Sequence, residues 1–402
     1  MLAFFNTNRI YKYWRWLAFA SLFFMENKKY KLKESVDVYT FNTENSDKTT
    51  IQFYKINTRE KVTIEINSIF LEILSALDGK KTLRSIFYEK NYHYDKDDLL
   101  ELFVFLIKKG IIIEISETTI INKYDYERYS RQINYFDDLI PEKKGELSQK
   151  ELSNKKIVII GCGATGGIIA DQLVRMGIRK LILIDYKEIN NNHFSRHIYS
   201  DSKSITLDKI TALKKHLQKI DHKVDVNTLK EKIRPDSNLD NLIPRDTDLV
   251  INTADEPYIG HISIKLGRYL WSKNIGLYIS GGFDAHLMSS GELIFKGLTP
   301  CIDCCSNTFK NALKDWKPKY NHNSKIKVTS KIESNQVVIG GSGGVFPQAL
   351  YSSSLASMNI VDFLLGNNKG SNKKNKRGEF LIEHCEHTWF EMKKQEGCNY
   401  CG

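Results

Sequence analysis

Residues 157–185 read IVIIGCGATGGIIADQLVRMGIRKLILID. An apolar run at residues 157–160 leads into a glycine-rich loop, which is followed by a helical pattern and a second apolar run at residues 181–184. This order predicts a strand, a phosphate-binding turn, a helix and a second strand. The stretch therefore predicts an α/β unit that binds a nucleotide, and residues elsewhere must decide what the nucleotide is for.

Each glycine of the loop has an expected role in nucleotide binding. Gly161 permits the tight turn, Gly163 lets the backbone approach a phosphate, and Gly166 lets the helix pack on the strand. Gly167 completes the set, and the helix N-terminus that follows offers amide donors to phosphate. Asp185 ends the second strand, about 20 residues beyond the loop, where an acid accepts hydrogen bonds from ribose hydroxyls.

The bulk composition is that of a globular protein. The chain has 402 residues, enough for two or three domains, with 41% hydrophobic and 27% charged residues. The net charge of +11 is spread along the chain, which favours attraction to anions such as nucleotides over a nucleic-acid interface. Four of the seven cysteines form two C-x-x-C pairs, which favours a metal in a reducing compartment. We therefore expect a cytoplasmic protein without a nucleic-acid or membrane partner.

Residues 1–24 carry a pattern of their own. Arg9, Lys12 and Arg15 precede an apolar run at residues 16–24 that resembles the core of a signal peptide. The run is shorter than the roughly 20 residues that a bilayer span needs. We interpret the segment as a misassigned upstream start or an extra amphipathic tail, since export would put a nucleotide site and the C-x-x-C pairs in the wrong compartment.

Residues 25–115 predict a small α+β, winged-helix-like domain. The alternating runs VDVYTF, TTIQFYKI and KVTIEI indicate antiparallel strands, and IFLEILSAL, TLRSIFYEK and DDLLELFVFLIKKG indicate three helices before the strand IIIEI. Such a unit suits peptide binding by β-augmentation, a purely structural role, or a DNA recognition helix. The acidic segment at residues 95–101 disfavours phosphate contact, so we prefer peptide binding.

The rest of the chain predicts a linker and a larger domain. Residues 116–150 are polar and predict a linker that carries the segment YERYSRQ. Residues 366–378 contain no apolar side chain and predict a solvated loop. Across residues 151–402, apolar runs alternate with amphipathic helices, which predicts a doubly wound, mostly parallel, Rossmann-like sheet. Its strands are expected at residues 157–160, 181–184, 248–252 and 277–280.

Three charged residues indicate chemistry at the phosphates. Arg196 and Lys209 follow Asp185 by 11 and 24 residues, and both are expected to reach a triphosphate on the glycine loop. The diphosphate of a nicotinamide cofactor is satisfied by the helix N-terminus alone, so these cations disfavour a dehydrogenase. Asp255 follows a strand, where it faces the ligand crevice and is well placed for Mg²⁺. Asp248, at the start of that strand, is expected to be structural.

Two cysteine pairs indicate a metal site. PCIDCC supplies Cys301 and Cys304, and GCNYCG at the end of the sequence supplies Cys398 and Cys401. Two C-x-x-C pairs far apart in the sequence can form a tetrahedral Cys₄ zinc site. Four thiolates leave no open coordination position, so this Zn²⁺ is expected to be structural.

These segments together resemble the ThiF/MoeB/HesA superfamily of adenylyltransferases, relatives of the ubiquitin-activating enzymes. The matching pieces follow the family order from about residue 125 onward: YERYSRQ, IGCGATGG, LIDYKEI, HFSRH, the stretch 208–212, TADEP and the paired C-x-x-C. The resemblance implies a doubly wound sheet that binds ATP and Mg²⁺, activates a C-terminal carboxylate as its acyl-adenylate, and releases pyrophosphate.

The resemblance also implies roles for single residues. It implies that Asp185 holds the ribose, that Arg196 and Lys209 hold the phosphates, and that Asp255 holds the metal. Arg131, in the SRQ segment, matches an arginine that in this family reaches the site of a neighbouring subunit. A homodimer is therefore expected.

The sequence departs from the family pattern in two places. His193 stands where the family commonly has an asparagine, so either His193 or the adjacent Asn192 is expected to make that phosphate contact. No cysteine lies between Cys305 and Cys385 that would serve as a thioester-forming nucleophile. Cys162, inside the glycine loop, is expected to be a packing residue, and Cys385 a buried thiol.

The layout of the chain favours a peptide substrate. Activators of sulfur carriers usually begin near the YERYSRQ segment, whereas adenylyltransferases of microcin C type carry a small amino-terminal domain that clamps a precursor peptide. We therefore hypothesise that residues 25–115 bind a short, ribosomally made peptide whose C-terminal carboxylate is adenylated. Gly281 and Gly282 are expected to approach this peptide through their backbone. The alternatives are activation of a ubiquitin-like sulfur-carrier protein and a non-catalytic scaffold that presents a peptide.

Overall fold

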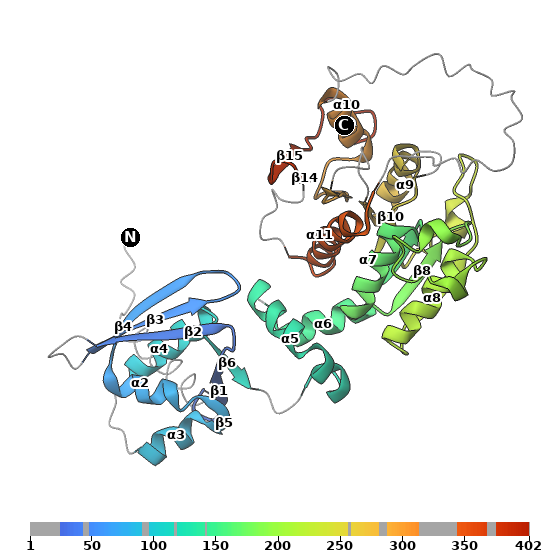
Figure 1. The fold of residues 1–402 in the computed structure, drawn as a ribbon. Helices are drawn as coiled ribbons and strands as arrows, with labels where there is room; N and C mark the ends of the chain where they lie inside the picture. Colours follow the sequence, from blue (N-terminus) through green and yellow to red (C-terminus); the bar gives the residue numbers. More distant parts are fainter. Residues whose placement is uncertain are drawn as a thin grey trace, which may run out of the picture. The chain divides into compact units, whose positions relative to one another are not determined.

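The computed structural model describes residues 25–42, 48–90, 96–115, 119–140, 143–255, 259–280, 288–312, 344–367 and 375–401. The chain divides into two compact units, Met1–Lys150 and Glu151–Gly402, and each has its own sheets and core (Figure 1). The predicted amino-terminal tail, Gly281 and Gly282 lie outside the described residues. Among the described residues, no helix has both the length and the apolar character that crossing a bilayer requires.

The first unit contains the predicted α+β arrangement. Its two antiparallel sheets have the strand orders β5-β1-β6 and β2-β3-β4. In β3 the side chains of Thr49, Ile51 and Phe53 are buried in alternation, as a strand with one covered face requires. The elements are β1 (Lys29–Leu32), β2 (Val36–Asn42), β3 (Lys48–Lys55), β4 (Lys61–Asn67), α2 (Ser68–Ser75), β5 (Asp78–Thr82), α3 (Leu83–Lys90), α4 (Lys96–Lys108) and β6 (Ile112–Ile115).

The helices of this unit bury one apolar face each. In α4, Leu99, Phe103 and Leu106 are spaced by four and three residues and are at most 1% exposed. This spacing places them on one side of the helix, where they join the core that contains Ile51 and Phe53. The sequence therefore predicted α2, α3 and α4 and the strands β2, β3, β4 and β6, but it did not predict β1 and β5.

The segment expected to be a polar linker is helical. It forms α5 (Lys123–Leu139) and α6 (Gly145–Asn154). Asn122 caps α5 by accepting a hydrogen bond from the Asp125 amide at 3.0 Å. The polar composition concealed the helix, because α5 buries only a narrow stripe: Asp125, Tyr129, Ile133 and Phe136.

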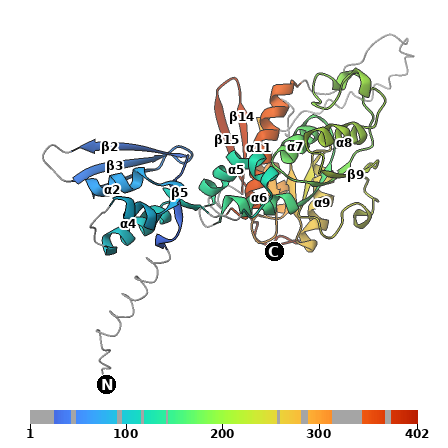
Figure 2. The same ribbon diagram turned by 90° about the horizontal axis from the view of Figure 1, so that it is seen from below.

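The second unit is built on a six-stranded sheet with the order β13-β11-β10-β7-β8-β9. The five strands from β11 to β9 run parallel, and β13 is antiparallel to β11. Figure 1 labels β8 and β10 of this sheet, and Figure 2 labels β9. This confirms the predicted doubly wound, mostly parallel sheet. The strands are β7 (Lys156–Ile160), β8 (Lys180–Ile184), β9 (Asp225–Leu229), β10 (Leu249–Asn252), β11 (Gly276–Ile279) and β13 (Glu292–Ile294). The apolar pattern did not predict β9, because its sequence DVNTL contains few apolar residues.

The strand order reverses between β7 and β10. The chain runs from β7 outward through β8 and β9, and then returns to the other side of β7 with β10 and β11. Ligands of doubly wound sheets bind at such a switch point, at the carboxyl ends of the strands. The glycine loop follows β7, and Asp185 and Asp255 follow β8 and β10 at this edge.

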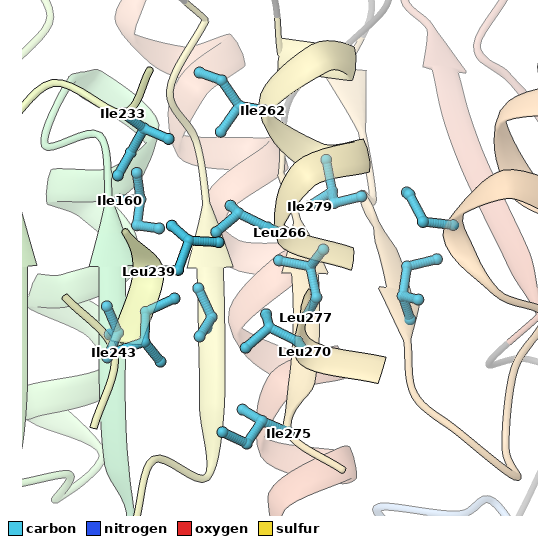
Figure 3. Packing of buried hydrophobic residues seen from close by; sticks show 14 of the residues in the cluster. Ile160, Ile233, Leu239, Ile243, Ile262, Leu266, Leu270, Ile275, Leu277 and Ile279 are labelled. Atoms are coloured by element: carbon cyan, nitrogen blue, oxygen red, sulfur yellow. The ribbon is translucent and has the colours of Figure 1, made fainter. Parts of the chain in front are cut away.

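Side chains from the sheet and from helix α9 (Ile259–Lys273) form the core on one face. Figure 3 shows Ile262, Leu266 and Leu270 of α9 over the sheet residues Leu277 and Ile279. These five side chains are at most 4% exposed. The remaining helices of this unit are α7 (Ala164–Arg175), α8 (Lys209–Ile220), α10 (Ile302–Ala312) and α11 (Phe346–Leu364).

The prediction of a solvated loop at residues 366–378 is wrong for the last residues of this range. Lys376–Leu381 form β14, which pairs with β12 (Met288–Ser289) and β15 (Glu386–Glu391). Arg377 is 2% exposed and bonds Glu292 at 3.0 Å and Glu379 at 3.1 Å. Its guanidinium also lies 5.2 Å from the ring centroid of Phe309. One carboxylate from β13 and one from β14 itself therefore hold a cation that the sequence had predicted to be solvated.

This buried ion cluster makes a testable contribution to stability. Replacing Arg377 with Ala leaves Glu292 and Glu379 buried without their cation, and burial already raises the pKa of Glu292. We expect Arg377→Ala to lower the free energy of unfolding by about 3 to 5 kcal/mol. Lys376→Ala, at the exposed neighbouring position, is the control and should change it by less than about 0.5 kcal/mol. Denaturant unfolding measures both, and equal effects would contradict the assignment.

Candidate functional site

The glycine loop is packed tightly against the end of β10. Gly161 has φ +87°, and a Cβ atom there would lie 2.6 Å from the Ala254 nitrogen. A Cβ atom at Gly166 would lie 2.0 Å from the Gly161 oxygen. Thr253 fixes the contact, because its amide donates to the Ile160 oxygen at 2.8 Å and its hydroxyl donates to the Gly161 oxygen at 2.6 Å. The geometry agrees with the turn and packing roles expected of Gly161 and Gly166.

The other two glycines of the loop differ from each other. No heavy atom would lie within 4 Å of a Cβ atom at Gly163, so the space beside it is open to a ligand. A Cβ atom at Gly167 would instead lie 2.5 Å from Cε1 of Tyr199. The structure therefore places Gly167 against an aromatic ring, a contact that the sequence did not indicate.

Asp185 lies beside the loop at the end of β8. One of its oxygens accepts a hydrogen bond from the Cys162 amide at 2.7 Å, and the other accepts one from the Lys187 amide at 2.9 Å. The side chain is largely buried, with 9% exposed. A carboxylate offers about four acceptor positions, so two backbone bonds leave room for the hydroxyls of a ribose.

Lys209 is a buried cation at the start of α8. It is 6% exposed, and burial lowers the pKa of its ammonium, while the charges of Asp185 and Asp255 act in the opposite direction. Asp255 and Arg196 are exposed. The charges of both acids thus favour the Lys209 ammonium, and a phosphate in this place would further compensate a charge that is costly to bury.

His193 lies in the same neighbourhood, at the end of a short 3-10 helix (Asn191–His193). Its Nδ1 accepts a hydrogen bond from the Asn190 amide at 2.9 Å, so the neutral ring carries its proton on Nε2. Burial and then the charges of Lys209 and Arg196 lower the pKa of His193 to about 4. A neutral N–H donor therefore occupies the position where an asparagine amide was expected, and the adjacent Asn192 is exposed.

His197 and Tyr199 belong to this site and were not singled out from the sequence. The His193 and His197 rings are stacked, with centroids 4.5 Å apart. His197 Nδ1 lies 3.1 Å from the Tyr199 hydroxyl, which donates to the Cys162 oxygen. Burial lowers the pKa of His197 to about 3. The only signal in the sequence was their place in HFSRHIY, beside the predicted cations.

Two further residues, Arg131 and Asp248, were singled out from the sequence. Arg131 is an exposed residue of α5 in the first unit, and its contact with a neighbouring subunit stays a prediction. Asp248 is structural, as expected, since it bonds the Lys155 ammonium at 2.9 Å and the Lys156 amide at 2.8 Å.

The four predicted metal ligands come together. The sulfur atoms of Cys301, Cys304, Cys398 and Cys401 all lie within 4.8 Å of one another. The distances are 3.7 Å for Cys301–Cys398 and 3.6 Å for Cys304–Cys401. These values exceed a disulfide bond and are close to the roughly 3.8 Å sulfur separation in a ZnS₄ tetrahedron with 2.3 Å bonds. The residues therefore fit Zn²⁺.

Backbone donors support a thiolate in this cluster. Amide hydrogen bonds from Tyr400 and Cys401 lower the pKa of Cys398 to about 6. The Gln395 amide donates to the Cys304 sulfur at 3.4 Å, which acts against burial, since burial raises the pKa of Cys304 and of Cys301 in the absence of a metal. Donors aimed at sulfur favour the charged form that zinc binds.

The other cysteines take no part in this cluster. Burial raises the pKa of Cys162 and of Cys305, so both thiols are held neutral, as the packing role expected for Cys162 requires. Cys385 was expected to be a buried thiol, and this is wrong. It is exposed in the turn between β14 and β15, with φ +52°. The tight turn directs this side chain into solvent, although apolar residues follow it in the sequence.

Comparisons with known proteins agree with this geometry. A sequence model described as the ThiF family matches residues 129–399. The vegetative HesA protein of Trichormus variabilis is 27% identical over 180 residues, which are 45% of this chain and 63% of HesA. The adenylyltransferase and sulfurtransferase UBA4 of Debaryomyces hansenii is 26% identical over 184 residues, 45% of this chain and 38% of UBA4. The match thus spans less than two thirds of either relative.

Solved structures share the fold over nearly the whole chain. E. coli MccB with AMPCPP and selenomethionine-labelled MccA superposes with a TM-score of 0.67 at 18% identity, covering 93% of this chain and 99% of MccB. PaaA has a TM-score of 0.67 at 20% identity, covering 90% of this chain and 100% of PaaA. At these identities the likeness shows the fold.

The cysteine cluster predicts a metal content that can be measured. We expect purified protein to hold about one zinc ion per chain by elemental analysis. Cys304→Ser should abolish stoichiometric zinc and lower the Tm by at least about 5 °C. Cys385→Ser removes an exposed thiol and is the control, with zinc content and Tm unchanged. Zinc retained by Cys304→Ser would show that these cysteines do not hold it.

The buried histidine predicts a pH dependence of stability. The pKa of His197 is about 3 in the folded chain and about 6.5 in an unfolded one, so only the unfolded chain takes up this proton as the pH falls. The contribution of the neutral His197 ring to the free energy of unfolding is fully present above pH 6.5. It is lost progressively below that pH, by about 2 kcal/mol at pH 5. The free energy of unfolding at pH 7 and pH 5 should therefore change less in His197→Gln than in the wild type. The same change in both proteins would contradict the assignment.

Proposed function

The chain belongs to the ThiF family, and on that premise we propose that it is an ATP-dependent adenylyltransferase that activates the C-terminal carboxylate of a ribosomally made peptide. One observation carries the proposal: Lys209 is buried at the edge of the sheet where a nucleotide would bind. The charges of Asp185 and Asp255 act on its ammonium there. A nicotinamide cofactor does not need a buried cation there, because no phosphate leaves during hydride transfer. A triphosphate that loses pyrophosphate needs one, because charge develops on the leaving group.

The proposed reaction balances without a further reactant. A carboxylate oxygen of the peptide attacks the α-phosphorus of ATP, the bond to the β-phosphate oxygen breaks, and acyl-adenylate and pyrophosphate are formed. Lys209 and Arg196 would stabilise the charge that accumulates on the phosphates. Asp255 would hold Mg²⁺, which would neutralise negative charge on the phosphates. Asp185 would hold the ribose, and Gly161, Gly163, Gly166 and Gly167 would shape the loop.

His193 would supply a neutral hydrogen bond to the nucleotide. Its Nδ1 is occupied by the Asn190 amide, which leaves the Nε2 proton for a phosphate or ribose oxygen. The side chain of Asn192 is exposed next to it and is the alternative donor. Arg131 would reach the same site in a neighbouring subunit, in which case the protein is a homodimer.

The amino-terminal unit would bind the peptide. In the described part of the chain, β2 is an edge strand of the β2-β3-β4 sheet. Tyr39 and Phe41 alternate on it and are 50% and 55% exposed, which is unusual for large apolar side chains. An extended peptide would pair with the free strand edge and cover these rings. MccB, whose solved structure holds MccA, has the same fold over 99% of its length.

We propose boundaries that follow this division of work. Residues 25–115 would bind the peptide, residues 116–150 would connect the units and carry the dimer contact, and residues 151–402 would perform the adenylation. The Cys₄ site would hold a structural Zn²⁺ that joins the carboxyl-terminal segment to α10. Thiolate ligands of this kind favour the cytoplasm as the working compartment.

A second candidate is activation of a ubiquitin-like sulfur-carrier protein. The similarity to UBA4, described as an adenylyltransferase and sulfurtransferase, favours it. It uses the same carboxylate chemistry with a folded partner, and it gives no role to residues 25–115. A non-catalytic peptide scaffold would keep ATP binding and lose pyrophosphate release.

Pyrophosphate exchange into ATP tests the proposal. We expect exchange that depends on a short peptide encoded beside the gene, in zinc-replete protein. Asp255→Ala and Lys209→Met should each reduce it by about 100-fold or more, because each removes charge stabilisation at the phosphates. Lys215→Ala, an exposed lysine on the same helix, is the matched control and should leave the rate unchanged.

The substrate added to the assay separates the alternatives. Exchange with a folded sulfur-carrier protein and with none of the peptides would assign the chain to carrier activation. ATP binding without exchange in the presence of either substrate would favour the scaffold. Equal losses in Lys215→Ala and Lys209→Met would contradict the role given to Lys209.

A further inference from the structure

Tyr199 bonds the glycine loop at the same residue as Asp185 does, Cys162. The two peptide units that flank Cys162 are both bonded: its amide donates to Asp185 at 2.7 Å, and its carbonyl accepts from the Tyr199 hydroxyl. Tyr199 is 7% exposed, so water does not compete freely for this bond. The orientation of the loop backbone at Cys162 is therefore determined on both sides.

The bond from Tyr199 also sets the direction of a neighbouring donor. The carbonyl of Cys162 and the amide of Gly163 belong to one planar trans peptide, in which the C=O and N–H bonds point in opposite directions. Holding the carbonyl toward Tyr199 thus turns the Gly163 N–H away from it. The space beside Gly163 is open, and Gly163 is the N-cap of α7. This N–H is one of the donors that a phosphate would meet at the helix N-terminus.

His197 determines which way the Tyr199 hydroxyl points. A phenol has one proton to donate, and Tyr199 gives it to the Cys162 oxygen. In the hydrogen bond of 3.1 Å between the two side chains, His197 Nδ1 must then be the donor and the Tyr199 oxygen the acceptor, so the proton is on Nδ1. His193 carries its proton on Nε2, so the two stacked rings are opposite tautomers. His197 therefore acts on the loop only through Tyr199.

Gly167 makes this arrangement sterically feasible. Its missing side chain leaves the volume in which the Tyr199 ring lies, since a Cβ atom would be 2.5 Å from Cε1. The ring can reach the Cys162 carbonyl only across this first turn of α7. The fourth glycine of GCGATGG thus serves the tyrosine.

We propose that Tyr199 and His197 are positioning residues that hold the Gly163 N–H toward the phosphates of the bound nucleotide. This inference rests on the proposed function, and it extends that function to the nucleotide subsite that the pair serves: the phosphates, and not the nucleoside. Tyr199 and His197 touch the loop backbone and each other, so their effect on a ligand is indirect.

The test compares binding of ATP and of adenosine to the full chain by calorimetry. Tyr199→Phe keeps the ring on Gly167 and removes only the hydroxyl. We expect it to weaken ATP binding about tenfold, because one phosphate donor loses its orientation, and to leave adenosine binding within about twofold. His197→Leu should match it, and His197→Gln should retain ATP affinity because its amide N–H can still donate to Tyr199. The variant that combines Tyr199→Phe with His197→Leu should be no weaker than either alone.

Three results would overturn the proposal: unchanged ATP affinity in Tyr199→Phe, equal losses for ATP and adenosine, or additive losses in the double variant. Tyr269→Phe is the control. It removes a hydroxyl near the carboxyl end of α9 that donates to Asp240, and the variant should bind both ligands normally. Thermal unfolding of each variant shows whether it is folded. A wild-type chain that does not bind ATP would overturn the proposed function itself, which is distinguishable from normal binding that Tyr199→Phe leaves intact.

Discussion

The contact between the glycine loop and the end of β10 is the constraint on which the site depends. Gly161 lies so close to Thr253 and Ala254 that no side chain fits between them, and Thr253 bonds the loop through its amide and its hydroxyl. Because β10 and β8 flank β7, this contact sets the acids that follow the two strands, Asp255 and Asp185, on either side of one loop. The positions that we propose for the ribose, phosphate and metal subsites follow from it.

Buried polar groups add precision that apolar packing lacks. Asp185 bonds the peptide unit before Cys162, and Tyr199 bonds the peptide unit after it. The Arg377 ion cluster and the four cysteine sulfurs hold the carboxyl-terminal segment in a similar way, in addition to its apolar contacts through Phe390 and Met392. A buried charge or thiolate is costly unless every partner is in place, so each of these groups specifies one arrangement of the chain.

Patterns local in sequence predicted much of the fold and part of the site. The apolar runs gave four strands of the parallel sheet, and the two C-x-x-C pairs gave the cysteine cluster. What was missed depends on partners distant in sequence. The polar strand β9 is held by β8, Arg377 is neutralised by Glu292 85 residues away, and Tyr199 meets a carbonyl 37 residues away. Spacing along the chain carries no signal for such contacts.

The central claim is that the chain forms an acyl-adenylate on a terminal carboxylate, and trapping that species with hydroxylamine tests it most directly. An acyl-adenylate reacts with hydroxylamine to give a hydroxamate and AMP, and mass spectrometry locates the hydroxamate on the peptide. The account predicts a hydroxamate at the C-terminal carboxylate, formed only with ATP. A peptide that binds together with ATP and stays unmodified would contradict it.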